Sequence, residues 1–180
     1  MASPHEMFTD LTEKVITITG GSRGLGKEMA LAFSRLGAHV VIASRKKENC
    51  EELAAHITKT TGQEALPVEC HVGEWDHCDA LFEKVQGHFG KCDVLINNAG
   101  MSPLYKSLSD VSEELFDKVL NVNLRGPFRL SARFGEQMVK AGSGSIINMC
   151  STASIQGGPM IFAYAASKSA IRGMTKSVAV

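Results

Sequence analysis

The sequence predicts an α/β fold with a doubly wound parallel sheet, because short apolar runs alternate with longer amphipathic segments along the chain. The apolar runs lack strict polar alternation, which is typical of strands covered by helices on both faces. Their order favours right-handed crossovers between parallel strands. The expected strands cover residues 15–18, 40–43, 65–68, 94–96 and 145–150.

The segments between these runs are predicted to be helices. Three of them stop at or near a glycine, a frequent cap at a helix C-terminus; they cover residues 24–36, 47–60 and 74–88. A fourth helix is expected to begin at Ser112, and residues 161–180 form a last helix in which the sequence stops. We therefore expect residues 1–180 to be a single domain that lacks C-terminal strands, with the strand over 145–150 left as an exposed apolar edge.

Composition limits the classes of partner. The 19 basic and 19 acidic residues balance, which indicates neither a nucleic-acid surface nor a membrane surface. The first residues do not resemble a secretory signal, and no apolar run is long enough to span a bilayer, so the cytoplasm is expected. Five cysteines at irregular spacings indicate buried free thiols. Cys70, His71, His77 and Cys78 match no standard zinc spacing, so no metal is expected.

A glycine-rich turn follows the first predicted strand and leads directly into a helix. Such a turn lets the backbone approach a pyrophosphate, and the helix N-terminus offers free N–H groups. A nucleoside-triphosphate P-loop is disfavoured, because Glu28 stands where that motif needs Ser or Thr for magnesium. The residues expected to bind a dinucleotide here are Gly20, Ser22, Arg23, Gly24, Leu25 and Gly26.

The end of the second strand indicates which dinucleotide is bound. An NAD site places an acidic residue there for the ribose 2′-hydroxyl, whereas this chain has Ser44, Arg45 and Lys46. Arg23 adds a second guanidinium, a group that suits phosphate geometry. The alternative is that Arg45 and Lys46 only solvate the strand end. We expect NADP, with NAD the less favoured cofactor.

Tyr164 and Lys168 lie four residues apart and share one face of the last helix, about 6 Å apart along its axis. The ordinary pKa of a tyrosine side chain, about 10, makes it a poor base at neutral pH. An ammonium about 4 Å away would stabilise a phenolate by about 4 kcal/mol at an effective dielectric constant of about 20. The pair could thus serve in general acid/base catalysis, although such a pair alone is common on helices.

Other polar residues are expected near the same sheet edge. Ser151 follows the strand over 145–150, and Asn97-Asn98-Ala99-Gly100 ends the fourth strand. Asn123 lies within a predicted helix, where asparagine is a poor helix former, so a polar or kinking role is plausible.

Together these motifs resemble those of the short-chain dehydrogenase/reductase family, in its order and spacing, from about residue 11 to the end. The resemblance implies a Rossmann-like fold, in which Tyr164 transfers a proton and Lys168 favours its phenolate and binds the nicotinamide ribose. Tyr164 and Lys168 are therefore both expected in the cofactor-binding site as well. The resemblance likewise implies that Ser151 orients the substrate oxygen and that Asn123 holds a water in a proton relay. Asn98, Ala99 and Gly100 would line the cofactor cleft.

The resemblance also implies an oxidoreductase that transfers a hydride between NADP(H) and a small-molecule carbonyl/alcohol substrate. It further implies a homodimer or homotetramer joined by the helical region over 112–140 and the helix of Tyr164. The family's Asp after the third strand is replaced here by Cys70-His71-Val72-Gly73. Family segments that would follow residue 180 are absent, so the alternative is a catalytically inactive fragment that binds dinucleotide or pairs with other subunits.

Overall fold

The computed structural model of the chain describes residues 11–179. Its centre is a five-stranded sheet in the order β3-β2-β1-β4-β5, with every neighbouring pair parallel. The expectations about a leader in the first residues and about Val180 fall outside this range. The strands are β1 (Val15–Thr19), β2 (His39–Ser44), β3 (Ala65–Glu69), β4 (Val94–Asn97) and β5 (Ser145–Asn148).

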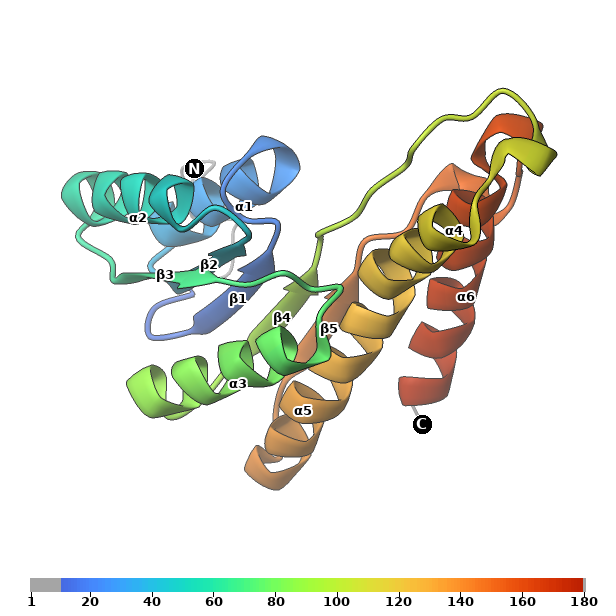
Figure 1. Cartoon of the computed structure of the whole chain (residues 1–180). Helices are drawn as coiled ribbons and strands as arrows, with labels where there is room; N and C mark the ends of the chain where they lie inside the picture. Colours follow the sequence, from blue (N-terminus) through green and yellow to red (C-terminus); the bar gives the residue numbers. More distant parts are fainter. Residues whose placement is uncertain (1–10, 180) are drawn as a thin grey trace, which may run out of the picture.

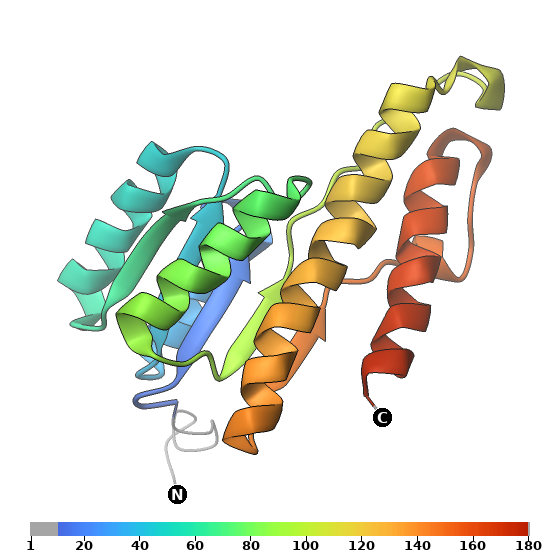
Figure 2. The same cartoon turned by 60° about the horizontal axis from the view of Figure 1, so that its bottom comes forward.

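Helices cover both faces of the sheet, which confirms the doubly wound architecture (Figures 1 and 2). Helices α1 and α2 pack on one face, and α3 and α5 pack on the other. Helix α6 lies beside α4 and the segment that joins α4 to α5. The helices are α1 (Gly24–Arg35), α2 (Lys47–Thr61), α3 (Trp75–Phe89), α4 (Glu113–Leu120), α5 (Gly126–Ala141) and α6 (Phe162–Val178).

The core consists of two apolar layers, because successive side chains of a strand point to opposite faces of the sheet. Val15 of β1 packs in the layer of α3 and α5. The next residue, Ile16, packs in the layer of α1 and α2. Burial on both faces explains why the strands are nearly continuous runs of Val, Ile and Leu.

In the C-terminal half, the end of the last strand, the burial of Cys150 and the start of the last helix differ from expectation, whereas the exposed sheet edge agrees with it. Strand β5 ends at Asn148, so Cys150 lies beyond it and is exposed, unlike the other four cysteines, which are buried and free. The last helix begins at Phe162, after a 3₁₀ turn over Pro159–Ile161. Ile147 of the edge strand is 43% exposed, as expected for an apolar edge.

The helix expected from Ser112 begins there, since its side chain accepts a hydrogen bond from the Leu115 N–H at 3.1 Å. After α4 the chain continues as a π-helix, Asn121–Arg125, before α5. The wider turn lies at the asparagines for which a polar or kinking role was expected, and π-turns often occur at functional sites. Among the described residues, no helix is long and apolar enough to cross a membrane.

An ion-pair cluster joins α3 to α5. Arg129 donates two hydrogen bonds to the carboxylate of Asp79, at 2.7 and 2.8 Å, and Arg133 lies 3.5 Å from the same carboxylate. The guanidinium of Arg129 also lies over the Trp75 ring, 4.7 Å from its centroid. Two parallel bonds from one guanidinium define the relative position of the two helices.

Candidate active site

The carboxyl ends of β1 to β4 open into a cleft of about 660 Å³, a size typical of a site for a small molecule or cofactor. Most of the predicted cofactor residues line it, namely Gly20, Ser22, Arg23, Gly24, Arg45, Lys46, Asn98, Ala99 and Gly100. Four predicted cofactor residues do not line it, namely Leu25, Gly26, Tyr164 and Lys168. The lining residues not predicted from sequence are Ser44, Asn49, Cys70, His71, Val72, Met101, Lys118 and Val122.

The glycine turn requires glycine at several points. Gly20 and Gly24 have φ angles of +63° and +54°, which L-residues rarely adopt. A Cβ on Gly26 would collide with the carbonyl oxygen of Gly20, so Gly26 lets α1 approach the strand. Arg23, the N-cap of α1, makes no side-chain cap bond. The first N–H groups of this helix therefore point toward the cleft as an anion site.

Asn98 supports this turn from the neighbouring strand end. Its side-chain amide donates to the carbonyl oxygens of Thr19 at 2.9 Å and Gly20 at 3.3 Å. The buried Thr19 hydroxyl accepts from the N–H groups of Asn98 at 3.0 Å and Ala99 at 3.1 Å. Asn98 thus lines the cleft while its amide holds the glycine turn.

The cleft has a cationic end. Arg23, Arg45 and Lys46 are exposed there, and none of the residues that line the cleft in the described chain is Asp or Glu. The Ser22 and Ser44 hydroxyl oxygens lie 2.8 Å apart, which joins the glycine turn to the end of β2. This end of the cleft suits a phosphate better than a neutral hydroxyl.

Lys168 does not line the cleft but is buried beside Gly100, a residue of the cleft wall, with only 5% of its surface exposed. Its ammonium donates to the Met149 carbonyl oxygen at 2.6 Å and lies 5.9 Å from the ring centroid of Tyr164. Burial lowers the pKa of Lys168, and the nearby Cys150 opposes that effect. A Cβ on Gly100, which lines the cleft, would lie 3.8 Å from the ammonium.

Asn123 is fully buried within the π-helix. Its amide donates to the Met101 carbonyl oxygen at 2.9 Å and to the Ser167 hydroxyl at 3.0 Å, and its oxygen accepts from the Met101 N–H at 2.9 Å. Both amide hydrogens are therefore used within the protein. Asn123 joins the loop after β4 to helix α6 immediately beside Lys168.

Ser151 caps a 3₁₀ turn, Thr152–Ser154, and accepts from the Ala153 N–H at 3.1 Å. Helix α6 packs on this turn, and the Ser169 hydroxyl donates to the Ser154 carbonyl oxygen at 3.2 Å. The turn of Ser151 is thus attached to the helix that carries Tyr164. Both Ser151 and Tyr164 are partly exposed, so a ligand can reach them.

Tyr105 also contributes to this region. Its side chain is buried, at 8% exposure. Its hydroxyl accepts from the Ala163 N–H at 3.3 Å, in the first turn of α6. It therefore connects the loop after β4 to the residue that precedes Tyr164.

Comparison with known proteins supports the arrangement. A family model described as short chain dehydrogenase matches residues 14–180. The chain is 40% identical over 167 residues to an uncharacterized oxidoreductase of Thermotoga maritima, covering 93% of this chain and 65% of that protein. A metagenomic short-chain oxidoreductase in complex with NADP aligns with a TM-score of 0.89 at 33% identity, over 94% of this chain and 76% of that one. NAD+-bound xylitol dehydrogenase aligns with a TM-score of 0.88 at 29% identity, over 94% and 65%.

The chain belongs to the short chain dehydrogenase family, as its motifs indicated. The two aligned structures carry different cofactors, so the class of cofactor that fits this fold is a nicotinamide dinucleotide. The chain spans 65% of the length of the Thermotoga relative.

Proposed function

We propose that this chain carries the cofactor cleft and the acid/base groups of an oxidoreductase that acts on a carbonyl/alcohol pair. The observation that carries the proposal is the meeting of three motifs at Gly100 in the wall of the cleft. A Cβ on Gly100 would lie 3.4 Å from the Asn123 amide oxygen and 3.8 Å from the Lys168 ammonium. A well-formed pocket with a few convergent polar groups is the default hypothesis for an active site.

The residues of the cleft fit a nicotinamide dinucleotide. A Cβ on Gly20 would lie 3.0 Å from Ala99 Cα, so the turn has no room for a side chain and its backbone can approach a pyrophosphate. The first N–H groups of α1 face the same place. A bound nicotinamide dinucleotide supplies or accepts the hydride.

In the direction of reduction, the Tyr164 hydroxyl donates a proton to the oxygen of the substrate carbonyl. The Lys168 ammonium, held by the Met149 carbonyl at 2.6 Å, stabilises the phenolate that this leaves. The bond that Ser151 accepts from Ala153 uses a lone pair of its hydroxyl, so its hydrogen can be donated to the same substrate oxygen. Both amide hydrogens of Asn123 are used within the protein. A relay water beside Asn123 therefore cannot accept a hydrogen bond from this amide and would instead donate one to an acceptor atom.

The proposed cofactor is NADP. The supporting observations are the Arg23 and Arg45 guanidiniums at the cationic end and the lack of Asp or Glu among the described lining residues. An aligned relative binds NADP, whereas another binds NAD+, so these residues carry the preference.

The proposed chemistry is tested with a panel of ketones and aldehydes and NADPH, on this chain and on Tyr164→Phe. Removing a general acid/base typically costs about 10²- to 10⁴-fold in turnover, while NADPH affinity is expected to change little. Wild-type turnover in Tyr164→Phe would defeat the mechanism. A chain that binds NADPH but turns over nothing would favour the alternative of a dinucleotide-binding fragment.

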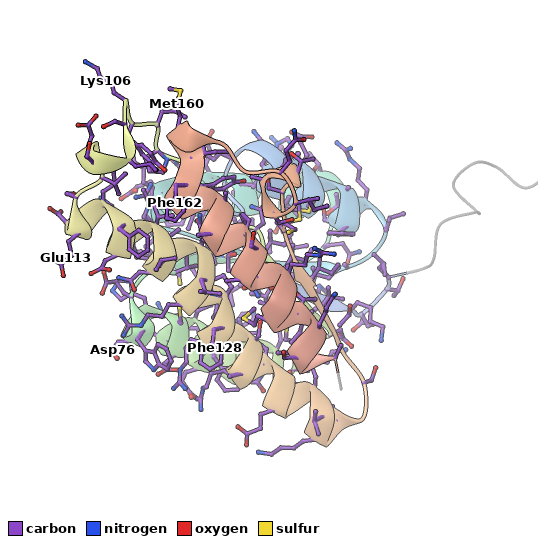
Figure 3. All side chains as sticks on the ribbon, turned by 90° about the vertical axis from the view of Figure 1, so that its right-hand side faces the viewer. Asp76, Lys106, Glu113, Phe128, Met160 and Phe162 are labelled. Carbon is purple, nitrogen blue, oxygen red and sulfur yellow. The ribbon has the colours of Figure 1, made fainter. Side chains whose placement is uncertain are left out.

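We further propose that the chain pairs with a second copy through α4, α5 and α6. A shallow, mainly apolar groove lies there between Leu120, Leu124, Phe128 and Met174, and Figure 3 looks onto this face, with Phe128 labelled. Phe128 is 48% exposed and adjoins the other apolar residues of the groove, and contiguous apolar surface of this kind can mark a protein–protein interaction site. Sedimentation velocity is expected to show a dimer that Phe128→Asp dissociates; a wild-type monomer would refute the pairing.

A further inference from the structure

Two cysteines outside the catalytic group lie where β3 passes into α3. Cys70 directly follows β3, and Cys78 lies in the first turn of α3. Cys70 is 2% exposed and Cys78 is 0% exposed, and Cys70 lines the cleft. The pair is therefore buried beneath the wall of the proposed cofactor site.

The loop between them holds the two thiols together. The Cys70 thiol donates to the His77 carbonyl oxygen at 3.5 Å, and the Cys78 thiol donates to the Val72 carbonyl oxygen at 3.4 Å. Each sulfur is thus bonded to the backbone of the segment that carries the other one. The His71 N–H donates to His77 Nδ1 at 3.2 Å, which fixes the loop against the helix.

The two thiols also interact with each other, and they differ in acidity. The Cys70 thiol lowers the pKa of Cys78; burial and Asp79 oppose this, and Arg129 and Arg125 support it. The position of Cys78 at a helix N-terminus acts in the same direction. The same interaction, together with burial, raises the pKa of Cys70. Cys78 is therefore the nucleophile of the pair, and Cys70 holds the proton.

We propose that Cys70 and Cys78 form a reversible disulfide in the wall of the cleft, with a small peroxide as oxidant. The Cys78 thiolate attacks one oxygen of hydrogen peroxide; the O–O bond breaks, an S–O bond forms, and the leaving hydroxide takes up a proton as water. The Cys70 sulfur then displaces the hydroxyl from Cys78 and forms the S–S bond. In total, two thiols are oxidised, one peroxide is reduced to two waters, and both thiol hydrogens end in those waters. A dithiol reverses the step.

The bridge changes the cleft, a consequence that rests on the proposed dinucleotide site. The two sulfur atoms must lie about 2.05 Å apart to form the bridge, which draws the end of β3 toward α3. His71 and Val72, the two lining residues after Cys70, move with it. A bound dinucleotide covers this wall, so binding and oxidation are expected to oppose each other, and by linkage each weakens the other.

The disulfide is tested by mass spectrometry. The folded protein is treated with hydrogen peroxide, denatured, alkylated and digested with trypsin. Both cysteines fall in one tryptic peptide, residues 60–84, because no Lys or Arg lies between Lys59 and Lys84. We expect this peptide to be unalkylated and lighter by two hydrogen atoms, and to be alkylated at both cysteines after dithiothreitol.

Two variants make the result specific. Cys78→Ser is expected to abolish the bridge, whereas Cys92→Ser, which removes a buried thiol that does not line the cleft, is expected to leave it intact. Far-ultraviolet circular dichroism checks that both variants are folded. A wild-type peptide that remains alkylated at both cysteines, or that is oxidised irreversibly at one of them, would overturn the proposal.

Protection by cofactor separates this proposal from the proposed function. NADP+, which is not a reductant, at about ten times its Kd leaves about a tenth of the protein free, so bridge formation is expected to slow about tenfold. A bridge that forms at the same rate with NADP+ bound would refute the link to the cleft. If calorimetry shows no NADP+ binding, the proposed function fails, whereas the peptide result still decides whether the disulfide forms.

Discussion

Tyr105 shows how one side chain can connect distant parts of the candidate active site. Its hydroxyl accepts from the Ala163 N–H at 3.3 Å, and Ala163 is the second residue of α6. N–H groups in the first turn of a helix have no partner within the helix. The Tyr105 phenol therefore satisfies a buried donor immediately before Tyr164. Tyr105 is thus a positioning residue for the proposed proton transfer.

Replacing this hydroxyl is expected to affect stability and turnover but not cofactor binding. Tyr105→Phe leaves the buried Ala163 N–H without its partner, which costs about 1–3 kcal/mol. We expect lower thermal stability and a reduced kcat, with NADPH affinity unchanged, because Tyr105 does not line the cleft. Lys106→Ala, an exposed change in the same loop, is the control. A Tyr105→Phe protein with wild-type stability and kcat would contradict the assignment.

At this scale, the sequence predicted residues that belong to motifs and missed those that act through tertiary contacts. Asn123, Ser151, Tyr164 and Lys168 were predicted from type and spacing, and their roles stay predictions. The contacts of Thr19 and Tyr105 could not have been found this way, because each joins residues more than fifty positions apart in the sequence. Asn98 was predicted as a lining residue, and its bonds to the glycine turn emerged only from the fold.

At the scale of elements, the link between α3 and α5 offers a test of pH dependence. The hydrogen bonds from Arg129 hold the pKa of Asp79 below its ordinary value, with Arg133 contributing and desolvation opposing. The unfolded chain therefore binds more protons than the folded one between the two pKa values. The stabilisation is fully present above the ordinary pKa of an aspartate, about 3.9, and is lost as pH falls through the lower folded value.

Asp79→Asn is expected to lower the free energy of unfolding at pH 7 by about 0.5–1 kcal/mol. The figure is small because the Asp79 side chain is 30% exposed and solvent screens the pair. The difference from wild type should shrink as pH falls below about 3.9, as measured by urea denaturation across that range. Glu136→Gln, which removes an exposed pair with Lys140 on α5, should change stability less. An Asp79→Asn difference that is constant with pH would contradict the electrostatic account.

Elements were predicted more completely than their ends. All five strands and the helices between them lie where the alternation of apolar runs placed them, because burial on both faces leaves a strong sequence signal. The end of β5 was placed two residues too late, since Cys150 is exposed after the strand. The last helix was placed one residue too early, at Ile161, which is the last residue of the 3₁₀ turn over Pro159–Ile161. Such short turns depend on local packing, which hydrophobic periodicity does not encode.

At the scale of the whole molecule, the parallel sheet gathers charges from separate elements at one edge. Arg23 comes from the glycine turn, and Arg45 follows β2, yet both line one cleft with Lys46 and Lys118. The whole chain carries no net charge by formal count, so the fold creates a local cationic site from a neutral sequence. The sequence predicted the first three of these cations, whereas Lys118 arrives from α4 through the fold alone.

This arrangement predicts that NADP+ stabilises the folded chain more than NAD+ does. A ligand at about a hundred times its Kd adds about 2.7 kcal/mol to the free energy of unfolding, so equal concentrations of the two cofactors report their relative affinities as shifts in Tm. In Arg45→Ala, the shift with NADP+ should fall by an amount that matches roughly a tenfold weaker affinity, about 1.4 kcal/mol. The shift with NAD+ should remain, because NAD+ has no 2′-phosphate for Arg45 to bind. Lys47→Ala is the matched control, since Lys47 is exposed and pairs with Glu51 instead of lining the cleft. Equal shifts with both cofactors in the wild-type chain would show that Arg23 and Arg45 merely solvate the end of the cleft.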